Sequence, residues 1–448
     1  MFNKILIANR GEIAVRIIRA CRELGIRTVA VFSTADKTSL HAQIADEAIC
    51  IGPPATKDSY LNVKAILAAC ELTGAKAVHP GFGFLSENAA FAKNCERCGV
   101  TFIGPKASSM ELMGDKAEAK KTMRKANVPV VPGSEGVVET IEEAKEISNQ
   151  IGYPVMVKAS AGGGGRGIRL VKNENELESL MTAAKQEALN FFGNADVYIE
   201  KFIVDPRHVE IQILGDNFGN VIHLGERDCS MQRRNQKVLE ESPCPIMTPQ
   251  LREEMGAAAV RAAKACDYQN AGTIEFLLGA DNHFYFMEMN TRIQVEHPIT
   301  ELVTGVDLVK QQILIASGEK LPISQDEVKL SGHAIECRIN AENPYFNFRP
   351  SPGKITALHM PGGPGIRIDS HVYQGYEISP YYDSMIAKLI AYAPTRDEAI
   401  KKMKWALAEF LIEGVDTNID FQLNLLRDEN FEKSTYDIGY LNRTNIMK

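Results

Sequence analysis

Residues 4–33, KILIANRGEIAVRIIRACRELGIRTVAVFS, predict the fold of the first part of the chain. Residues 4–8 are an apolar run of strand length, and residues 11–24 repeat apolar side chains at helical spacing until Gly25. Residues 27–33 are a second apolar run. A strand–helix–strand unit predicts a parallel, doubly wound sheet, so the fold class is α/β. The turn after the first strand lacks G-x-G-x-x-G, and a dinucleotide site is not indicated.

Length and composition indicate a multi-domain globular protein. The 448 residues exceed the length of about 250–300 at which a single core stops growing. The net charge of −7 argues against a nucleic-acid partner. No apolar run is long enough to span a membrane, and the N-terminus lacks the pattern of a signal peptide. Nine cysteines suit reduced thiols in the cytoplasm, and the Cys95 and Cys98 pair is interpreted as packing.

The order of predicted elements divides the chain into three regions, expected at 1–113, 114–330 and 331–448. The second region begins with a charged helix and contains several strands. The third opens with a strand near 333–341 and ends with an amphipathic helix near 396–411.

A glycine run, AGGGGRG at 161–167, lies between two predicted strands. It does not match the Walker sequence, which needs Lys and Ser or Thr before a helix. Bare backbone N–H groups can close over phosphates where side chains would clash, and Lys158 adds a cation beside the run. A flexible surface hairpin is the alternative. A phosphate-binding lid is the favoured interpretation.

A predicted hairpin joins residues 272–280 to residues 283–290. A two-residue turn at Asp281-Asn282 would pair Ala280 with His283 and place Glu275 opposite Glu288. Directly opposed carboxylates destabilise a sheet unless a cation lies between them. With Asn290 as a third oxygen ligand, the pattern favours a Mg²⁺ site over two solvated side chains.

The segment after the hairpin, TRIQVEHP at 291–298, alternates Arg292, Gln294 and Glu296. In extended backbone these side chains would point the same way, so that arginine could hold a planar oxyanion and glutamate could act as a base. The alternative is a surface ion pair. The charge-rich stretch 226–241 is expected to be mainly a solvated face, and Arg338 lies on the polar face of its predicted strand.

Together these stretches resemble biotin carboxylase, the ATP-grasp component of biotin-dependent carboxylases. The resemblance runs in order through KILIANRGEIAVRIIRACRELGI, HPGFGFLSEN, MGDK, KASAGGGGRGIRLV, RHVEIQIL, ERDCSMQRR, EMNTRIQVEHPITE, CRINAE and YYDSM. It implies a Rossmann-like N-terminal domain, a central ATP-grasp domain with a glycine-rich lid at about 130–203, and an α+β C-terminal domain.

The resemblance also implies site residues. The nucleotide site would contain Lys116, Lys158, Gly164, Gly165, Glu200, Lys201, Phe202, Ile203, His208, Gln232 and Asn235. Glu275, Glu288 and Asn290 would hold Mg²⁺ or Mn²⁺ beside ATP. Bicarbonate would contact Lys237, Arg292, Gln294, Val295 and Glu296, and biotin would contact Arg338 and Phe82. Two residues depart from the family pattern: Asn235 replaces the usual histidine, and Phe82 replaces a tyrosine.

The implied reaction has two stages. Glu296 would deprotonate bicarbonate held by Arg292, and the oxyanion would attack the γ-phosphate of MgATP to give carboxyphosphate and ADP. Carboxyphosphate would yield CO₂ and phosphate, and the phosphate would take the N1 proton of biotin. Arg338 would stabilise the ureido enolate of biotin.

The chain has no Met-Lys-Met biotinylation motif, so a separate biotin carboxyl carrier protein and separate carboxyltransferase subunits are expected. The resemblance implies a cytoplasmic homodimer that serves acetyl-CoA carboxylase, with malonyl-CoA as the eventual product for fatty-acid synthesis. Three alternatives are a component of a two-chain pyruvate or acyl-CoA carboxylase, another ATP-grasp ligase, and a nucleotide sensor without catalysis.

Overall fold

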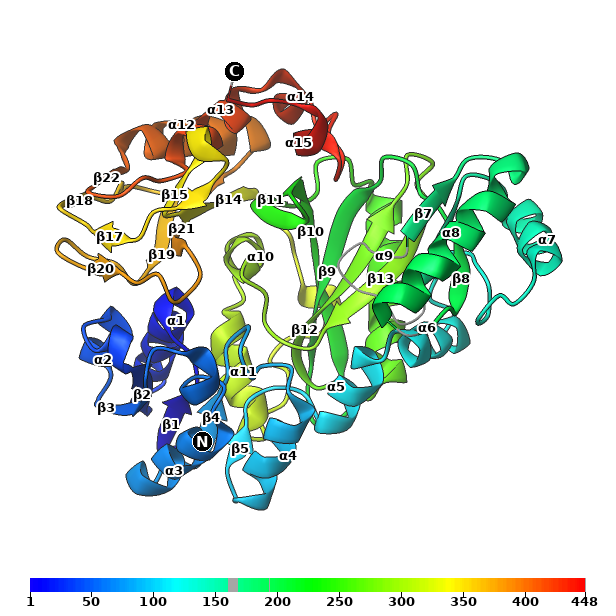
Figure 1. Ribbon diagram of the computed structural model, residues 1–448. Coiled ribbons are helices and arrows are strands. Elements are labelled where there is room, and N and C mark those ends of the chain that lie inside the picture. The colour runs from blue at the N-terminus through cyan, green and yellow to red at the C-terminus, as the bar shows by residue number, and fades with distance from the viewer. Residues whose placement is uncertain (160–167, 193, 448) are drawn as a thin grey trace. The chain divides into compact units, whose positions relative to one another are not determined.

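The computed structural model describes residues 1–159, 168–192 and 194–447. The glycine run at 161–167, and with it Gly164 and Gly165, lies outside these residues. The chain divides into two compact units (Figure 1). One comprises Met1–Val128, Arg207–Phe276 and Glu288–Lys448, and the other comprises Pro129–Pro206 and Leu277–Met287.

A five-stranded parallel sheet in the order β3-β2-β1-β4-β5 opens the first unit, and it confirms the predicted α/β class. Its strands are β1 (Lys4–Ile7), β2 (Arg27–Ser33), β3 (Glu47–Gly52), β4 (Ala77–His79) and β5 (Thr101–Phe102). Its helices are α1 (Gly11–Glu23), α2 (Leu40–Ile44), α3 (Val63–Thr73), α4 (Ala89–Arg97) and α5 (Ala107–Gly114). In β1, Ile5 and Ile7 enter one apolar cluster and Leu6 enters another. Because alternate side chains of a strand point to opposite faces, both faces of this sheet are covered.

The same unit contains most of an eight-stranded sheet in the order β13-β12-β9-β10-β11-β14-β21-β19. Its strands are β9 (Arg207–Gly215), β10 (Val221–Arg233), β11 (Gln236–Ser242), β12 (Asn270–Leu278), β13 (Phe284–Asn290), β14 (His333–Asn340), β19 (Ile366–Ser370) and β21 (Met385–Ala393). Between them in the chain lie α9 (Pro249–Ala265), α10 (His297–Thr304) and α11 (Leu308–Ala316). The sheet brings strands from the second and third predicted regions side by side, since β11 pairs with β14.

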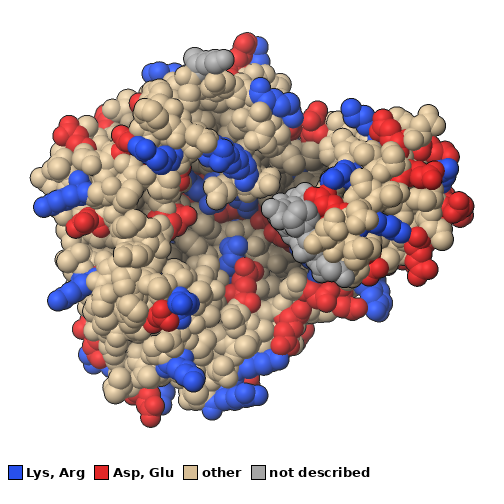
Figure 2. Space-filling view, in the orientation of Figure 1, with Lys and Arg blue, Asp and Glu red and all other residues tan. Residues whose placement is uncertain are grey.

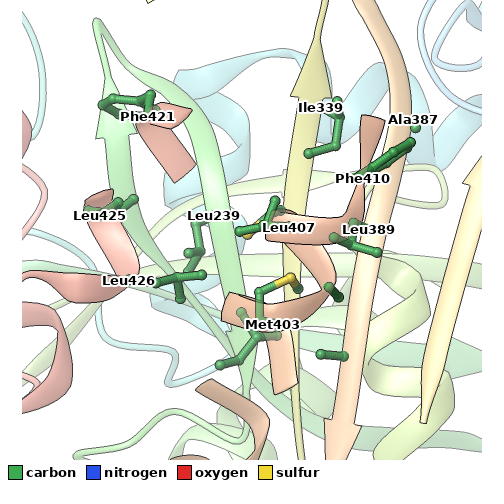
Figure 3. Close-up of a cluster of buried hydrophobic side chains, with 14 of the residues drawn as sticks. Leu239, Ile339, Ala387, Leu389, Met403, Leu407, Phe410, Phe421, Leu425 and Leu426 are labelled. Carbon is green, nitrogen blue, oxygen red and sulfur yellow. The ribbon is translucent and has the colours of Figure 1, made fainter. Parts of the chain in front are cut away.

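A large apolar cluster packs between this sheet and the C-terminal helices α12 (Arg396–Glu409) and α13 (Ile419–Arg427) (Figure 3). Met403 and Leu407 of α12 lie against Leu389 of β21 in the cluster. On β14, Ile339 enters the cluster while Arg338 does not. The predicted division of this strand into a core face and a polar face is therefore confirmed.

The second unit has its own three-stranded antiparallel sheet, in the order β7-β6-β8. The strands are β6 (Val155–Ala159), β7 (Ile168–Val171) and β8 (Val197–Lys201), and the helices are α7 (Ile141–Ile151) and α8 (Glu174–Phe192). Alternate β6 residues Val155 and Val157 are buried against Leu177 and Met181 of α8. One apolar face covered by helices gives this unit a separate core.

Shorter elements complete the description: α6 (Lys116–Lys125), β15 (Glu342–Asn343), β16 (Arg349–Pro350), β17 (Gly353–Lys354), β18 (Ala357–His359), β20 (Glu377–Ile378), β22 (Leu411–Glu413), α14 (Glu429–Glu432), α15 (Tyr440–Arg443), and four 3₁₀ turns, η1 (Thr34–Asp36), η2 (Thr56–Asp58), η3 (Gln325–Glu327) and η4 (Pro344–Phe346). Basic and acidic side chains are interspersed over much of the face in Figure 2. No described helix is both long and apolar enough to cross a membrane. All nine cysteines are free, and of the C-x-x-C pair Cys95 is buried while Cys98 is exposed.

The β12–β13 hairpin corrects one expectation. The Gly279 N–H donates to the His283 carbonyl at 2.8 Å, and the Asn282 N–H donates to the Gly279 carbonyl at 3.0 Å. The connection is therefore a three-residue loop, and the expected pairing of Ala280 with His283 is wrong. The reason is local: Asn282 adopts a left-handed conformation with φ 63°, which suits a type I turn followed by a left-handed residue.

Candidate active site

Lys237 is the centre of a cluster of buried carboxylates in the first unit. Its Nζ lies 2.7 Å from Glu210 Oε2, 2.9 Å from Glu275 Oε1 and 2.7 Å from Glu296 Oε1. Burial alone would lower the pKa of Lys237, but the surrounding carboxylates raise it well above its usual range. Lys237 is therefore a fixed cation, and three acidic groups converge on it.

Lys237 reaches this position because β10 and β11 form a tight hairpin. Gln232 pairs with Lys237, and Arg233 pairs with Gln236. The two connecting residues, Arg234 and Asn235, both have positive φ values of 51° and 63°. Two left-handed residues form a type I′ turn, whose twist matches that of antiparallel strands.

Glu296 is fully buried at the start of α10 and is held by two cations. Besides the Lys237 contact, its Oε2 lies 3.0 Å from an Arg338 guanidinium nitrogen. Burial alone would raise the pKa of Glu296, but Lys237, Arg338 and Arg227 hold it well below its usual range. Glu296 is thus an ionised carboxylate whose proton affinity depends on where its two cationic neighbours lie.

Arg338 is held on its other side by Glu240. The Arg338 Nε donates to Glu240 Oε1 at 2.6 Å, and Glu240 is fully buried. Burial raises the pKa of Glu240 to about 7 against the opposing charge of Arg338. The guanidinium is therefore oriented by Glu296, whose pKa is lowered, and by Glu240, whose pKa is raised to about 7.

The predicted metal ligands offer three oxygen donors from β12 and β13. Glu275 and Asn290 are buried, and Glu288 is exposed. Partial desolvation and the negative charge of Glu275 raise the pKa of Glu288. A hard divalent cation would relieve this repulsion, and carboxylate and amide oxygens are its preferred ligands. The donor set therefore fits Mg²⁺ or Mn²⁺.

Arg292 fixes the segment between the metal ligands and Glu296. It donates to Asn290 Oδ1 at 2.9 Å, to Gln294 Oε1 at 3.0 Å and to Glu87 Oε2 at 2.9 Å. Gln294 in turn donates to Glu275 Oε1 at 2.8 Å. The expected extended backbone is wrong at Val295 and Glu296, which form a turn because α10 starts directly after them, with Pro298 in its first turn.

The remaining predicted residues of the first unit lie around this cluster. His208 Nε2 is 3.2 Å from Glu275 Oε2, and its Nδ1 contacts Gln232 Nε2 at 2.9 Å. Lys116 is exposed at the start of α6, where its charge acts on Glu288. Asn235 is exposed in the β10–β11 turn.

Two further predicted residues are anchored through backbone carbonyls. The Val295 carbonyl accepts from Nζ of the fully buried Lys388 at 2.8 Å. The Phe82 carbonyl accepts from Asn9 Nδ2 at 2.7 Å. Both contacts fix the position of the main chain. The sequence did not predict a role for Lys388, because nothing in its own strand distinguishes it from a surface lysine.

In the second unit, Lys158 and Glu200 face each other across paired strands. Lys158 Nζ lies 2.5 Å from Glu200 Oε2. Lys201 donates from Nζ to the Gly152 carbonyl at 2.8 Å, and the Phe202 N–H donates to the Pro154 carbonyl at 3.1 Å. Ile203 follows, half-buried. This edge presents main-chain groups of 200–203 beside the Lys158 cation.

The charge-rich stretch 226–241 was expected to be mainly solvated, but most of it is buried. Arg227 is fully buried, where it contacts Glu210 at 2.5 Å and the Thr273 hydroxyl at 3.1 Å. Glu240 and Glu241 are also fully buried. The expectation is wrong because each charge has a partner on another strand, and buried ions are tolerated when they are paired.

The sequence did not predict a place in the site for five residues of the cluster: Glu87, Glu210, Arg227, Glu240 and Lys388. For Glu210, the signal was the polar–apolar alternation in RHVEIQIL at 207–214, which places Glu210 on the same face as Gln212. The other four had no local signal.

Sequence profiles of known families cover most of the chain. Residues 1–110 match the N-terminal domain of biotin carboxylase, residues 115–324 match the ATP-binding domain of the carbamoyl-phosphate synthase L chain, and residues 336–443 match the C-terminal domain of biotin carboxylase. The chain is 60% identical to biotin carboxylase 1 of Bacillus subtilis (strain 168), over the full length of both proteins. It is 57% identical to a pyruvate carboxylase subunit of Methanothermobacter thermautotrophicus, over 97% of this chain and 88% of that protein.

Solved structures agree with these matches. A biotin carboxylase complex with β-γ-ATP from Campylobacter jejuni superposes with a TM-score of 0.91 at 50% identity, covering 99% of each chain. The dimeric biotin carboxylase domain of Hydrogenobacter thermophilus 2-oxoglutarate carboxylase, in complex with MgADP, ADP and bicarbonate, superposes with a TM-score of 0.88 at 52% identity, covering 99% of this chain and 97% of that one.

Proposed function

The chain belongs to the biotin carboxylase family, and from this membership we propose that it uses ATP and bicarbonate to carboxylate biotin on a separate carrier protein. It is an ATP-dependent ligase. One observation carries the assignment of its chemistry: a fully buried Glu296 is held between Lys237 and Arg338. The two cations keep this carboxylate ionised, which is the form in which a general base can accept a proton.

Glu296 is proposed as the base that deprotonates bicarbonate, with Lys237, Arg292, Gln294 and Val295 around the anion. In the described state Lys237, Arg338 and Arg227 hold its pKa well below its usual range, which weakens it as a base. Bicarbonate and phosphate groups would share the positive charge of Lys237 and thereby raise the proton affinity of Glu296. Substrate binding would thus raise the pKa of Glu296 and make it a stronger base.

Arg338 is proposed to contact the ureido oxygen of biotin, near Phe82. Negative charge develops on that oxygen when N1 loses its proton, and a preorganised guanidinium stabilises it. Glu240 would hold the guanidinium in place, since its Oε1 accepts from Nε and also lies 2.6 Å from the terminal nitrogen that donates to Glu296.

The nucleotide contacts are proposed from the family resemblance. We assign phosphate contacts to Lys116, Lys158 and the backbone of Gly164 and Gly165. The other assigned contacts are Glu200, Lys201, Phe202 and Ile203 at the base, and His208, Gln232 and Asn235 on the ribose and phosphate side. Glu275, Glu288 and Asn290 would hold Mg²⁺ or Mn²⁺, which neutralises charge on the transferred phosphoryl group.

The reaction that consumes carboxybiotin is the finer part of the proposal. We favour acetyl-CoA carboxylase, and hence malonyl-CoA for fatty-acid synthesis, because two of the matched profiles and the full-length relative are named for biotin carboxylase. Service to a pyruvate carboxylase is the second candidate, because a relative of 57% identity bears that name. Mass spectrometry of the carboxyltransferase that copurifies with the native chain separates the two.

Three further inferences belong to this proposal. The domain limits are proposed at 113/114 and 330/331, with the lid at about 130–203. A homodimer is supported by the dimeric domain of the Hydrogenobacter thermophilus enzyme. A cytoplasmic location is supported by nine free cysteines, which persist in reducing compartments.

Phosphate release by the purified chain tests the proposed function. MgATP is supplied with bicarbonate and free biotin, singly and together. Release should require bicarbonate and rise when biotin is added. Release that is indifferent to both would mean that the chain activates a different acceptor, as another ATP-grasp ligase would.

A further inference from the structure

Two loops meet beside the active site and form an exposed patch of arginine and aromatic side chains, which we call the arginine–aromatic rim. One is the β10–β11 turn, and the other is the loop 343–350 after β14. Arg233 and Arg234 both donate to Asn347 Oδ1 at 3.0 Å. The Arg233 guanidinium also lies 3.7 Å from the ring centroid of Phe348. These contacts join the two loops into one surface.

The tip of the rim exposes large apolar rings to solvent. Tyr345 and Phe346 are 65% and 66% exposed, which is unusual for aromatic side chains. Arg234 and Arg349 are exposed beside them, and the Arg349 guanidinium lies 5.9 Å from the Phe346 centroid. Arginine and aromatic residues are enriched at protein interfaces and supply most binding hot spots.

The rim is continuous with the site. Lys237 is the second residue of β11, the strand that directly follows the turn carrying Arg234. Arg338 lies on β14, whose end leads directly into the loop that carries Tyr345. Any macromolecule that delivers a group to Arg338 would therefore pass close to the rim.

The charge of the rim is positive, although the whole chain carries −7. Within 233–236 and 342–350 there are three arginines, no lysine, and one acidic residue, Glu342. Such a patch attracts an acidic surface and excludes a basic one.

We propose that the arginine–aromatic rim is the docking surface for an acidic face of the biotin-bearing carrier protein. This proposal rests on the proposed function. Tyr345 and Phe346 would pack against the carrier, and Arg234 and Arg349 would pair with its carboxylates. The biotin arm would then enter the site beside Arg338.

The test compares two substrates for the full-length chain: free biotin and a purified biotinylated carrier protein from the source organism. The rim variant is Arg349→Glu with Phe346→Ser. The matched control is Lys320→Glu with Phe218→Ser, because Lys320 and Phe218 form an exposed cation–aromatic pair away from the rim in the sequence, with Nζ 5.1 Å from the ring centroid. Both variants remove one exposed ring and reverse one charge.

The rim variant should raise KM for the carrier about tenfold or more, since loss of hot-spot contacts costs 1.4 kcal/mol for each factor of about ten. Its carboxylation of free biotin should stay within about twofold of wild type, and the control should match wild type on both substrates. An unchanged carrier KM would overturn the proposal, as would equal losses with carrier and free biotin.

Two results would assign the rim a different role or none. If the rim variant alters the sedimentation of the chain while its carrier KM is unchanged, the rim binds a second copy, and the docking proposal is wrong. If wild type carboxylates neither substrate, the proposed function itself fails, and the rim variant plays no part in that result.

Discussion

Replacing Glu240 by glutamine tests whether the Arg338 guanidinium must be oriented for the biotin step. Glutamine keeps a hydrogen-bond acceptor of nearly the same shape but removes the charge that faces Arg338 Nε at 2.6 Å. A hydrogen bond to a charged group contributes about 1.5–3 kcal/mol, against about 0.5–1.5 kcal/mol for a neutral one. The expected loss is therefore about 1–1.5 kcal/mol, or about 5- to 13-fold in the rate of biotin carboxylation.

The assay measures two rates for each variant: bicarbonate-dependent ATP cleavage without biotin, and carboxylation of free biotin. For Glu240→Gln the first should stay within about twofold of wild type. Because burial raises the pKa of Glu240 to about 7, the carboxylation defect should be small at pH 6 and full at pH 8.5. Only the ionised carboxylate differs in charge from glutamine.

Glu336→Gln is the matched control. Glu336 lies opposite Glu240 in the β11–β14 ladder and is also fully buried, but its carboxylate has no hydrogen-bond partner among the described residues. Burial raises the pKa of Glu336 well above its usual range, so glutamine replaces a neutral acid there. Equal defects in the two variants, or a Glu240→Gln defect that does not vary with pH, would refute the positioning role.

Three further predictions concern the metal, pH and the core. Glu288→Gln should raise the Mg²⁺ concentration needed for half-maximal ATP cleavage, because one oxygen ligand loses its charge, and an unchanged Mg²⁺ requirement would remove Glu288 from the metal site. Burial raises the pKa of Glu12 from 4.5 to about 7, so its contribution to stability is present below pH 4.5 and is lost as the pH rises through 7. Thermal melts over this pH range should show that the free energy of unfolding of Glu12→Gln falls by about 3 kcal/mol less than that of wild type. Parallel pH curves for the two proteins would contradict this prediction. Leu407→Ala should lower the free energy of unfolding, measured in urea, by about 2–5 kcal/mol, because Leu407 is buried in the core (Figure 3). Leu411→Ala, at a half-exposed leucine, should change it by about 0.5 kcal/mol or less. Equal losses in the two variants would place Leu407 outside the core.

The sequence predicted elements best where periodicity and local turns decide the structure. The strand at 27–33 has the predicted bounds, because an apolar run between a helix stop and polar residues has few alternatives. The hairpin turn was misplaced by one residue, because the left-handed conformation of Asn282 is one of several that asparagine adopts.

Burial of charge was the feature that local sequence could not predict. Arg227 lies in a run that is as polar as a solvated surface, yet its partners include Glu210 on β9 and Thr300 on α10. Pairing of strands far apart in the chain decides whether such a residue is buried. The resemblance to a known family supplied Lys237 and Glu296, whereas Glu240 and Lys388 needed the three-dimensional arrangement.

Transfer of labelled bicarbonate is the most direct test of the central claim, that Glu296 between Lys237 and Arg338 drives carboxylation of biotin. Wild type, supplied with MgATP, radiolabelled bicarbonate and free biotin, should form acid-labile carboxybiotin in a one-to-one ratio with phosphate released above the biotin-free rate. Glu296→Gln should lose both the label transfer and the bicarbonate-dependent phosphate release by more than about 100-fold, the low end of what a general base contributes. Label transfer by Glu296→Gln at the wild-type rate would contradict the account.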